Sequence, residues 1–105
     1  MKIIYNITVS IDYALCEKWL MWMKSTHIPD MLSTGKFLEA KLSKIMGEES
    51  GGASYSIQYL CENMETYNLY IAENSQKLQN DHNAKFQGNF AAFRTILQLE
   101  EHFTA

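Results

Sequence analysis

Two histidines at the ends of apolar helical patterns are the side chains best suited to chemistry in this sequence. His27 continues a stripe in which apolar residues recur every three or four positions, and His82 holds the corresponding place in the second half of the chain. Because an imidazole titrates near neutrality, either histidine is a candidate general base or ligand-orienting group. We therefore take His27 and His82 as catalytic candidates that face a space between helix and sheet.

Pro29 supports a purely structural interpretation of His27. Proline has no N–H and its ring crowds the carbonyl of Ser25, so the helix is expected to end or kink around His27. A histidine in a last turn can hydrogen-bond free carbonyls, and Asp30 suits the start of a short second turn. Capping predicts a raised pKa for His27, whereas an apolar pocket predicts a lowered pKa. Pro29 slightly favours capping.

Five further residues are candidates for ligand binding. Tyr5 and Tyr59 are expected on central strands facing the helices, where a buried hydroxyl needs a partner. Arg94 falls on a largely apolar strand face and must find a carboxylate or a carbonyl. An interface salt bridge or an anionic ligand would each satisfy it. The set is completed by Trp22 and Phe86, although aromatic residues at such spacing are also typical of an ordinary core.

The sequence motifs do not indicate a metal site or a phosphate-binding loop. His27 and Asp30 could share a helical face as metal ligands, with His82 as a third, but no dense ligand spacing supports this set, and no metal is expected. The run Thr34-Gly35-Lys36 resembles the end of a phosphate loop, yet Asp30 stands where the leading glycine is required. The sequence also has no G-x-S-x-G elbow.

The composition predicts one domain over residues 1–105, with a short tail at 100–105. Hydrophobic residues make up 47% and charged residues 20%, which is ordinary for a globular protein. The net charge is −3 without a basic cluster, so neither nucleic acid nor a membrane surface is an expected partner. Two cysteines without a C-x-x-C pair, and no apolar stretch of about 18 residues, predict a cytoplasmic protein.

Hydrophobic periodicity predicts the elements that hold these side chains. Residues 3–11 and 53–61 alternate as strands do, while Asp12 and Asn63 suit helix caps. The predicted elements are strand 3–11, a helix from Asp12 to about His27, strand 36–46, a loop at 47–52, strand 53–61, helix 64–86 and strand 89–99. The buried stripe of the second helix is predicted as Tyr67, Ile71, Asn74, Leu78 and His82.

This order predicts an α+β fold, a ferredoxin-like βαββαβ sandwich in which a four-stranded antiparallel sheet carries both helices on one face. The last strand is apolar on both sides, with Phe90 and Ile96 on one and Phe93 and Leu97 on the other. A strand apolar on both sides needs cover on both. A second copy, packed sheet to sheet, is the simplest cover for the open face, so a homodimer is predicted.

The chain resembles a small bacterial family, the domain-of-unknown-function 4286 family, in three segments: WLMWMKSTHIPDML (19–32), GGASYSIQYLC (51–61) and HNAKFQGNFAAFRTIL (82–97). The resemblance implies the dimeric α/β-barrel superfamily, in which two four-stranded sheets close into a barrel with helices outside. It implies no reaction, because the family has no established one. The superfamily includes cofactor-free monooxygenases, haem-degrading enzymes, lactone isomerases, dehydratases and ligand-sensing domains, so the fold does not select a function.

The same resemblance argues against haem. Haem-degrading members of the superfamily use an asparagine on the first strand with a tryptophan and a histidine on the second helix. Ile7 stands at the position of that asparagine, Asn6 points to the opposite face, and residues 64–86 contain no tryptophan. No cofactor is therefore expected.

Three classes of function stay open from the sequence. The first is a cofactor-free enzyme acting on a small apolar or aromatic carbonyl compound in a pocket between helix and sheet. The second is a non-catalytic module that binds or senses a small molecule, and the third is a purely structural dimer with a filled core. A cavity of roughly a few hundred Å³ reached by either histidine would exclude the third class. Neither substrate nor reaction can be named from the residues.

Overall fold

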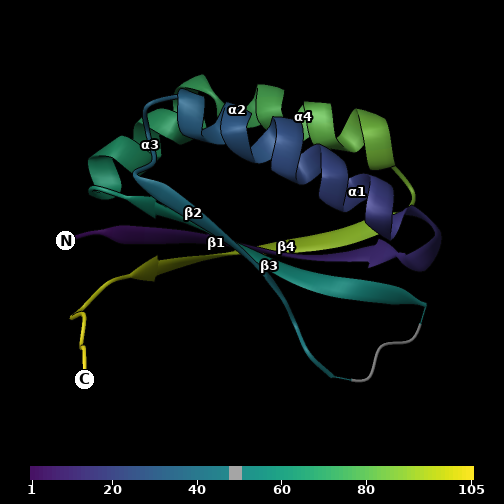
Figure 1. Ribbon diagram of the computed structural model, residues 1–105. Helices are drawn as coiled ribbons and strands as arrows, with labels where there is room; N and C mark the ends of the chain where they lie inside the picture. Colours follow the sequence, from purple (N-terminus) through teal and green to yellow (C-terminus); the bar gives the residue numbers. More distant parts are fainter. Residues whose placement is uncertain (48–50) are drawn as a thin grey trace.

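The computed structural model describes residues 1–47 and 51–105, and its helices lie in one layer above a sheet (Figure 1). The elements are β1 (Ile3–Asp12), a 3-10 turn (Tyr13–Leu15), α1 (Cys16–Trp22), a π-helical turn (Met23–His27), α2 (Ile28–Ser33), β2 (Glu39–Lys44), β3 (Gly52–Cys61), α3 (Met64–Glu73), α4 (Ser75–Phe86) and β4 (Phe90–Gln98). The hairpin tip predicted at 47–52 lies partly outside the described residues, at 48–50.

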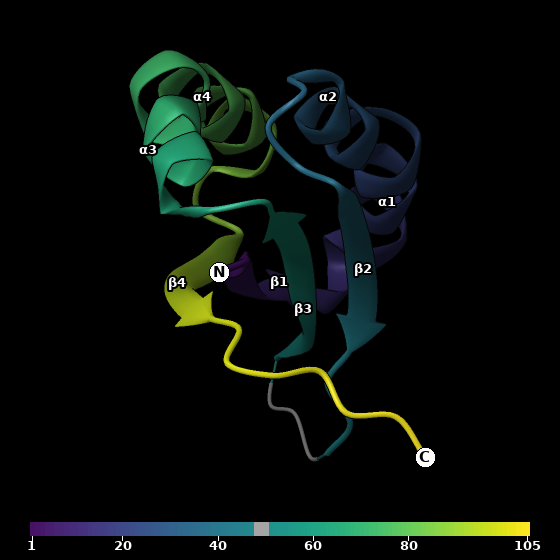
Figure 2. The same cartoon turned by 90° about the vertical axis from the view of Figure 1, so that its left-hand side faces the viewer.

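The sheet has the strand order β2-β3-β1-β4, and its paired strands are antiparallel. Tyr5 of β1 pairs with Tyr59 of β3, and Ile7 of β1 pairs with Arg94 of β4. These four residues therefore lie on the same face of the sheet, the face that the helices cover. Within the described residues, the helices cover that single face and none lies on the opposite face (Figures 1 and 2). This arrangement confirms the predicted α+β, ferredoxin-like βαββαβ sandwich.

Alternation along the strands creates the core between the two layers. Tyr5 and Val9 of β1 are buried, as is every second residue of β3 from Ala53 to Cys61. The helices contribute large buried side chains such as Trp19 and Phe86. Each such side chain removed from water stabilises the fold by about 1.5 to 3 kcal/mol. The helix-facing positions of the strands therefore hold the fold together.

Pro29 disturbs the first helix at the predicted place, where an end or a kink was expected, and the helix does not end there. The helix widens into the π-helical turn, where the N–H of Ile28 bonds to the carbonyl of Met23, five residues earlier. Pro29 then lies in the first turn of α2, the part of a helix that tolerates proline best. A π turn accommodates the proline, so helical residues continue to Ser33.

The second helix is divided, although one helix over 64–86 was predicted. Asn63 caps α3 as expected, because its Oδ1 accepts the N–H of Thr66 at 2.8 Å. Asn74 then leaves the helical conformation, with φ −128° and ψ −33°. The hydroxyl of Ser75 donates to the carbonyl of Ile71 at 3.1 Å, a bond of the kind that bends helices.

The buried stripe of this helix differs from the prediction at Ile71, and the predicted Asn74 is only partly buried. Ile71 is 43% exposed, whereas Tyr70 is buried. Tyr67 and Tyr70 are three residues apart and therefore share a helix face, which in α3 is the face toward the sheet. The predicted positions Leu78 and His82 are buried on α4 as expected.

β2 is shorter than the predicted strand 36–46. Phe37 lies before the strand and is nevertheless buried in the core, stacked on Tyr5 with ring centroids 6.2 Å apart. Gly35 and Gly88 connect the helices to β2 and β4 with φ of +77° and +85°. L side chains rarely adopt this conformation, so glycine is required at both turns.

The open face of the sheet is polar in its centre and apolar along β4. The hydroxyl of Ser56 donates to Oδ1 of Asn6 at 2.6 Å, whereas Phe93 on β4 is 64% exposed. The C-terminal residues pass along this side of the sheet (Figure 2). Of the helices in the described ranges, none is long and apolar enough to cross a membrane.

Candidate functional site

A small cavity lies between the helices and the sheet, where the two histidines were expected to point. Its volume is about 30 Å³. A buried water needs roughly 10 to 15 Å³ on this scale, so the cavity has room for about two or three waters. This is far below the few hundred Å³ that would exclude a filled core. The lining residues are Tyr5, Ile7, Val9, Met23, His27, Met31, Ile57, Tyr59, Tyr70, Leu78, Gln79, His82, Phe90, Ala92 and Arg94.

The π-helical turn carries His27 into this cavity. The side chain is only 7% exposed, and its Nδ1 is buried without a hydrogen-bond partner. One face of the ring stacks on Trp22, with centroids 4.8 Å apart. Burial lowers the pKa of His27, although the charges of Asp30 and Asp81 act in the opposite direction. The imidazole is therefore neutral at pH 7.

The capping interpretation of His27 is wrong. Capping required a helix that ends near His27, a side-chain bond to the helix terminus and a raised pKa. The helix continues instead, the side chain makes no capping bond, and its pKa is lowered. The physical reason is the π turn, which directs the imidazole toward the apolar interior.

His82 reaches the same cavity from α4, and its protonation is fixed by a neighbour. Its Nε2 accepts a hydrogen bond from Nε1 of Trp19 at 2.9 Å. An indole nitrogen only donates, so Nε2 carries the lone pair and Nδ1 the proton. Burial, followed by the charges of His27 and Arg94, lowers the pKa of His82 to about 4. The two imidazoles lie with ring centroids 5.8 Å apart, and both are neutral at pH 7.

Two tyrosines on the central strands face this pair, as predicted. Tyr59 is fully buried, and its hydroxyl has no hydrogen-bond partner. Tyr5 accepts a hydrogen bond from Nε of Arg94 at 3.0 Å. Burial raises the pKa of both tyrosines above the usual value, so both keep their protons at neutral pH. Arg94 thus finds a hydroxyl within the chain, where a carboxylate or a carbonyl was expected.

Trp22 and Phe86 lie behind the histidines and do not line the cavity, unlike the other predicted site residues. Trp22 contacts Phe86 with ring centroids 5.6 Å apart, and Phe86 contacts His82 at 5.5 Å. Trp22 also contacts both imidazoles, with ring centroids 4.8 Å from His27 and 5.8 Å from His82. Direct ligand contact by either aromatic residue has no support in this geometry.

Sequence reasoning missed two residues that shape the site. Trp19 was not among the predicted site residues, although the need of a buried indole N–H for a partner was a signal that it would bond a nearby acceptor. Tyr70 was missed because the helical stripe was assigned to Ile71. Its hydroxyl donates to the sulfur of Met31 at 3.4 Å, which orients both side chains at the cavity.

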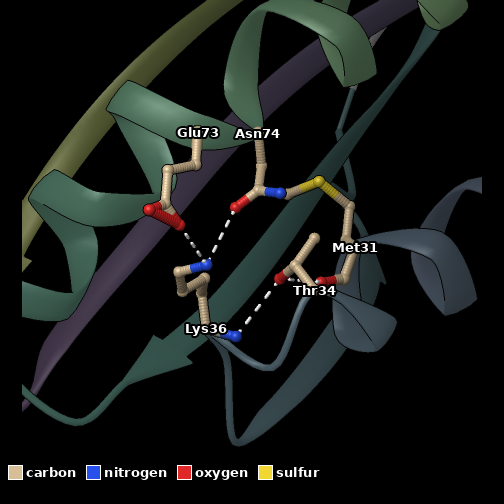
Figure 3. Close-up of polar contacts among 5 residues, drawn as sticks. All are labelled: Met31, Thr34, Lys36, Glu73 and Asn74. Carbon is tan, nitrogen blue, oxygen red and sulfur yellow. Dashed lines mark hydrogen bonds and ion pairs between the residues drawn. The ribbon is translucent and has the colours of Figure 1, made fainter.

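A polar cluster at one end of the helix layer holds α2 against the junction of α3 and α4 (Figure 3). Nζ of Lys36 lies 2.9 Å from Oε1 of Glu73 and donates to Oδ1 of Asn74 at 3.2 Å. Thr34 accepts the N–H of Lys36 and donates to the carbonyl of Met31 at 2.8 Å. The Thr34-Gly35-Lys36 run therefore ties the helices together and positions Met31.

Metal ligands do not gather at this site. Across the described ranges, no three His, Cys, Asp or Glu side chains form a group that could hold a metal ion. Asp30, the second ligand considered from the sequence, is exposed on α2 and does not line the cavity.

A sequence profile described as Domain of unknown function (DUF4286) matches residues 2–100. The chain belongs to the DUF4286 family. This confirms the family expected from the three sequence segments. Among curated proteins, none matches this DUF4286 chain.

Solved structures share the fold of this DUF4286 protein. A dimeric ferredoxin-like protein from an uncultured marine organism has a TM-score of 0.70 and 15% identity, covering 98% of this chain and 99% of that chain. SnoaB, a cofactor-independent oxygenase from Streptomyces nogalater, has a TM-score of 0.69 and 8% identity, covering 99% of this chain and 98% of that chain. HapK from Hahella chejuensis has a TM-score of 0.67 and 7% identity, covering 100% of this chain and 99% of that chain. At such identities the likeness concerns the fold alone.

Proposed function

We propose that this DUF4286 protein is a cofactor-free enzyme that removes a proton from a small apolar or aromatic carbonyl compound between helix and sheet. The observation that carries the proposal is a pair of buried polar atoms without partners, Nδ1 of His27 and the hydroxyl of Tyr59, which line one cavity. Buried polar atoms are nearly always hydrogen-bonded. Because both residues line the same cavity, these atoms could offer an acceptor and a donor to a bound molecule.

The two atoms suit complementary roles in proton abstraction. We infer that the proton of neutral His27 lies on Nε2, which leaves the lone pair of Nδ1 for a C–H next to a carbonyl. Tyr59 keeps its proton because burial raises its pKa, so its hydroxyl can donate to the carbonyl oxygen as negative charge develops there. His82 is already bound to Trp19 through Nε2 and is a neutral neighbour of His27.

A carbonyl compound larger than a few atoms requires the cavity to widen. The lining residue Gln79 on α4 is half-buried and Arg94 on the edge strand β4 is exposed, so the site reaches the surface between these elements. Separation of α4 from β4 would enlarge the cavity without breaking the sheet. The described cofactor-independent oxygenase activity of SnoaB supports small-molecule catalysis on this fold without a cofactor.

The small volume of the cavity favours one alternative, a purely structural dimer with a filled core. A module that binds a small molecule without turnover is the second alternative. Both alternatives predict no chemistry at His27, so one experiment separates them from the enzyme.

We infer further that two copies pack through the open sheet face, as the sequence predicted. Phe93 is 64% and Leu97 is 40% exposed on that face, and burial of such side chains favours association. The solved ferredoxin-like protein described as dimeric supports this assembly. The histidines lie on the other side of the sheet, so the assembly leaves the cavity accessible.

Hydrogen–deuterium exchange tests the proposed enzyme. The protein is incubated in D₂O with pyruvate, acetone and acetophenone, and loss of the protons next to the carbonyl is followed by NMR. We expect exchange above the buffer rate, abolished in His27→Gln and unchanged in the matched control His102→Gln in the exposed tail. Exchange that is equal in buffer and protein contradicts catalysis. Shifted His27 ring signals without exchange would instead identify the binding module.

A further inference from the structure

Arg94 stands at the edge of the cavity with most of its hydrogen-bonding capacity unused. It lies on β4 opposite Ile7, hence on the helix-facing side of the sheet. A guanidinium has five N–H donors. Within residues 1–47 and 51–105, only its Nε has a hydrogen-bond acceptor, the hydroxyl of Tyr5 at 3.0 Å. Its two terminal nitrogens are left to solvent or to a ligand.

The charge of Arg94 has no counterion at the cavity. None of the lining residues is an aspartate or a glutamate. The ion pairs of the described chain join Lys36 to Glu73 and Lys77 to Asp81, away from Arg94. The electrostatic influence of the guanidinium nevertheless extends to His82 and to three tyrosines, Tyr5, Tyr67 and Tyr70. A positive charge therefore dominates the site, although the whole chain is negative.

We propose that the ligand carries a carboxylate and that the terminal nitrogens of Arg94 bind it. The inference rests on the proposed function and adds the class of substrate, a small 2-oxo acid or a related carbonyl acid. Arg94 would hold the carboxylate by two parallel hydrogen bonds, and Tyr5 would fix the guanidinium through Nε. The carbonyl end would then extend toward Tyr59 and His27.

An ion pair across a subunit interface is the competing explanation for Arg94. The helix-facing side of β4 points away from the open sheet face through which we infer dimerisation. A dimer formed through that face therefore leaves the guanidinium free for a ligand. The two explanations differ in what the loss of Arg94 does to the dimer.

Matched acids and esters test the carboxylate. Pyruvate and phenylpyruvate are compared with their methyl esters, and dissociation constants are taken from the shifts of the His27 ring signals in NMR titrations. Since charge-assisted hydrogen bonds are the strong ones, we expect each acid to bind at least about tenfold more tightly than its ester. Arg94→Gln should remove that preference and leave the ester unchanged, and Arg94→Lys should retain part of it.

Lys41→Gln is the matched control, because it removes one positive charge on the opposite face of the sheet, where Lys41 pairs with Gln58. It should leave both dissociation constants unchanged. Equal affinity for acid and ester, or an acid affinity that survives Arg94→Gln, overturns the inference. The inference is also overturned if light scattering shows that Arg94→Gln weakens the dimer while the dissociation constant of the acid stays unchanged.

Failure of this inference can be distinguished from failure of the proposed enzyme. If the ester binds as well as the acid and still exchanges its protons through His27, only the carboxylate assignment is wrong. If neither compound shifts the His27 signals nor exchanges above the buffer rate, both proposals are wrong. Circular dichroism of each variant confirms that it folds.

Discussion

Nε1 of Trp19 donates a hydrogen bond to Nε2 of His82 at 2.9 Å, joining the first helix of the chain to the last. The two residues are 63 positions apart in sequence and both are buried. Because the indole N–H always donates, the bond holds His82 in its neutral form with the proton on Nδ1. One contact thus fixes both the helix packing and the protonation of a candidate site residue.

His82→Leu should therefore destabilise the protein more than His82→Gln. Leucine leaves the buried N–H of Trp19 without an acceptor, and an orphaned buried donor costs about 1 to 3 kcal/mol. Glutamine offers Oε1 near the original Nε2 and retains most of that energy. Urea unfolding of both variants measures the difference in free energy. Equal losses for the two substitutions would show that the bond contributes nothing.

Acid should weaken the fold through the same residue. The pKa of His82 is about 4 in the folded chain, against about 6.5 when unfolded, so the unfolded chain binds more protons between these values. Stability is complete above about pH 6.5 and falls as the pH approaches 4. The full shift corresponds to about 3 kcal/mol, and the lowered pKa of His27 acts in the same direction.

The pH effect is measured by urea unfolding at pH 7 and at pH 4.5. His82→Gln should lose less stability between these conditions than the wild type, because glutamine does not titrate. His102→Gln in the exposed tail is the matched control and should behave as the wild type does. An identical acid loss in the wild type and in His82→Gln would exclude His82 as the cause.

Tyr59→Phe should separate function from stability. The hydroxyl of Tyr59 is buried without a partner, so its removal should leave the free energy of unfolding unchanged or raise it by up to about 1 kcal/mol. The same change should abolish proton exchange, because the oxyanion loses its donor. Tyr5→Phe is the comparison, since it removes a hydroxyl that is bonded to Arg94. A clear loss of stability in Tyr59→Phe would reveal a structural role for that hydroxyl.

The dimer should depend on β4. Phe93→Glu places a charge on the open sheet face and should shift the protein from dimer to monomer in light scattering at micromolar concentration. Met21→Glu alters an equally exposed apolar residue on α1, at the other side of the molecule, and should leave the dimer intact. A monomeric wild type, or a dimer that persists in Phe93→Glu, would contradict assembly through this face.

Much of this fold can be predicted from the sequence, because period-two alternation fixes which strand residues face the helices. Tyr5 and Tyr59 lie opposite one another on the central strands for this reason. The spacing of Trp19, Met23 and His27 likewise identifies one buried helix face. Because the helical spacing of apolar residues is clear in both halves of the chain, the positions of both histidines on the sheet-facing sides of the helices could also be predicted.

Features that depend on non-local packing could not be predicted. Pro29 indicates a disturbed helix. Whether that helix ends or widens into a π turn depends on how its side chains pack in the interior. The break at Asn74 involves Lys36, which is distant in sequence. The cavity volume is the small difference between the space enclosed by the helices and the sheet and the volume of the side chains that fill it. No sequence pattern predicts this difference.

The pKa of the His27 ring tests the central claim most directly. Burial against an apolar cavity lowers this pKa, so an NMR titration of the ring, assigned with His27→Gln, should give a midpoint below about 6.5. His27→Gln should change the free energy of unfolding only slightly, since the side chain bonds nothing through Nδ1. A midpoint above about 6.5, with a clear loss of stability in His27→Gln, would contradict a neutral base in the cavity.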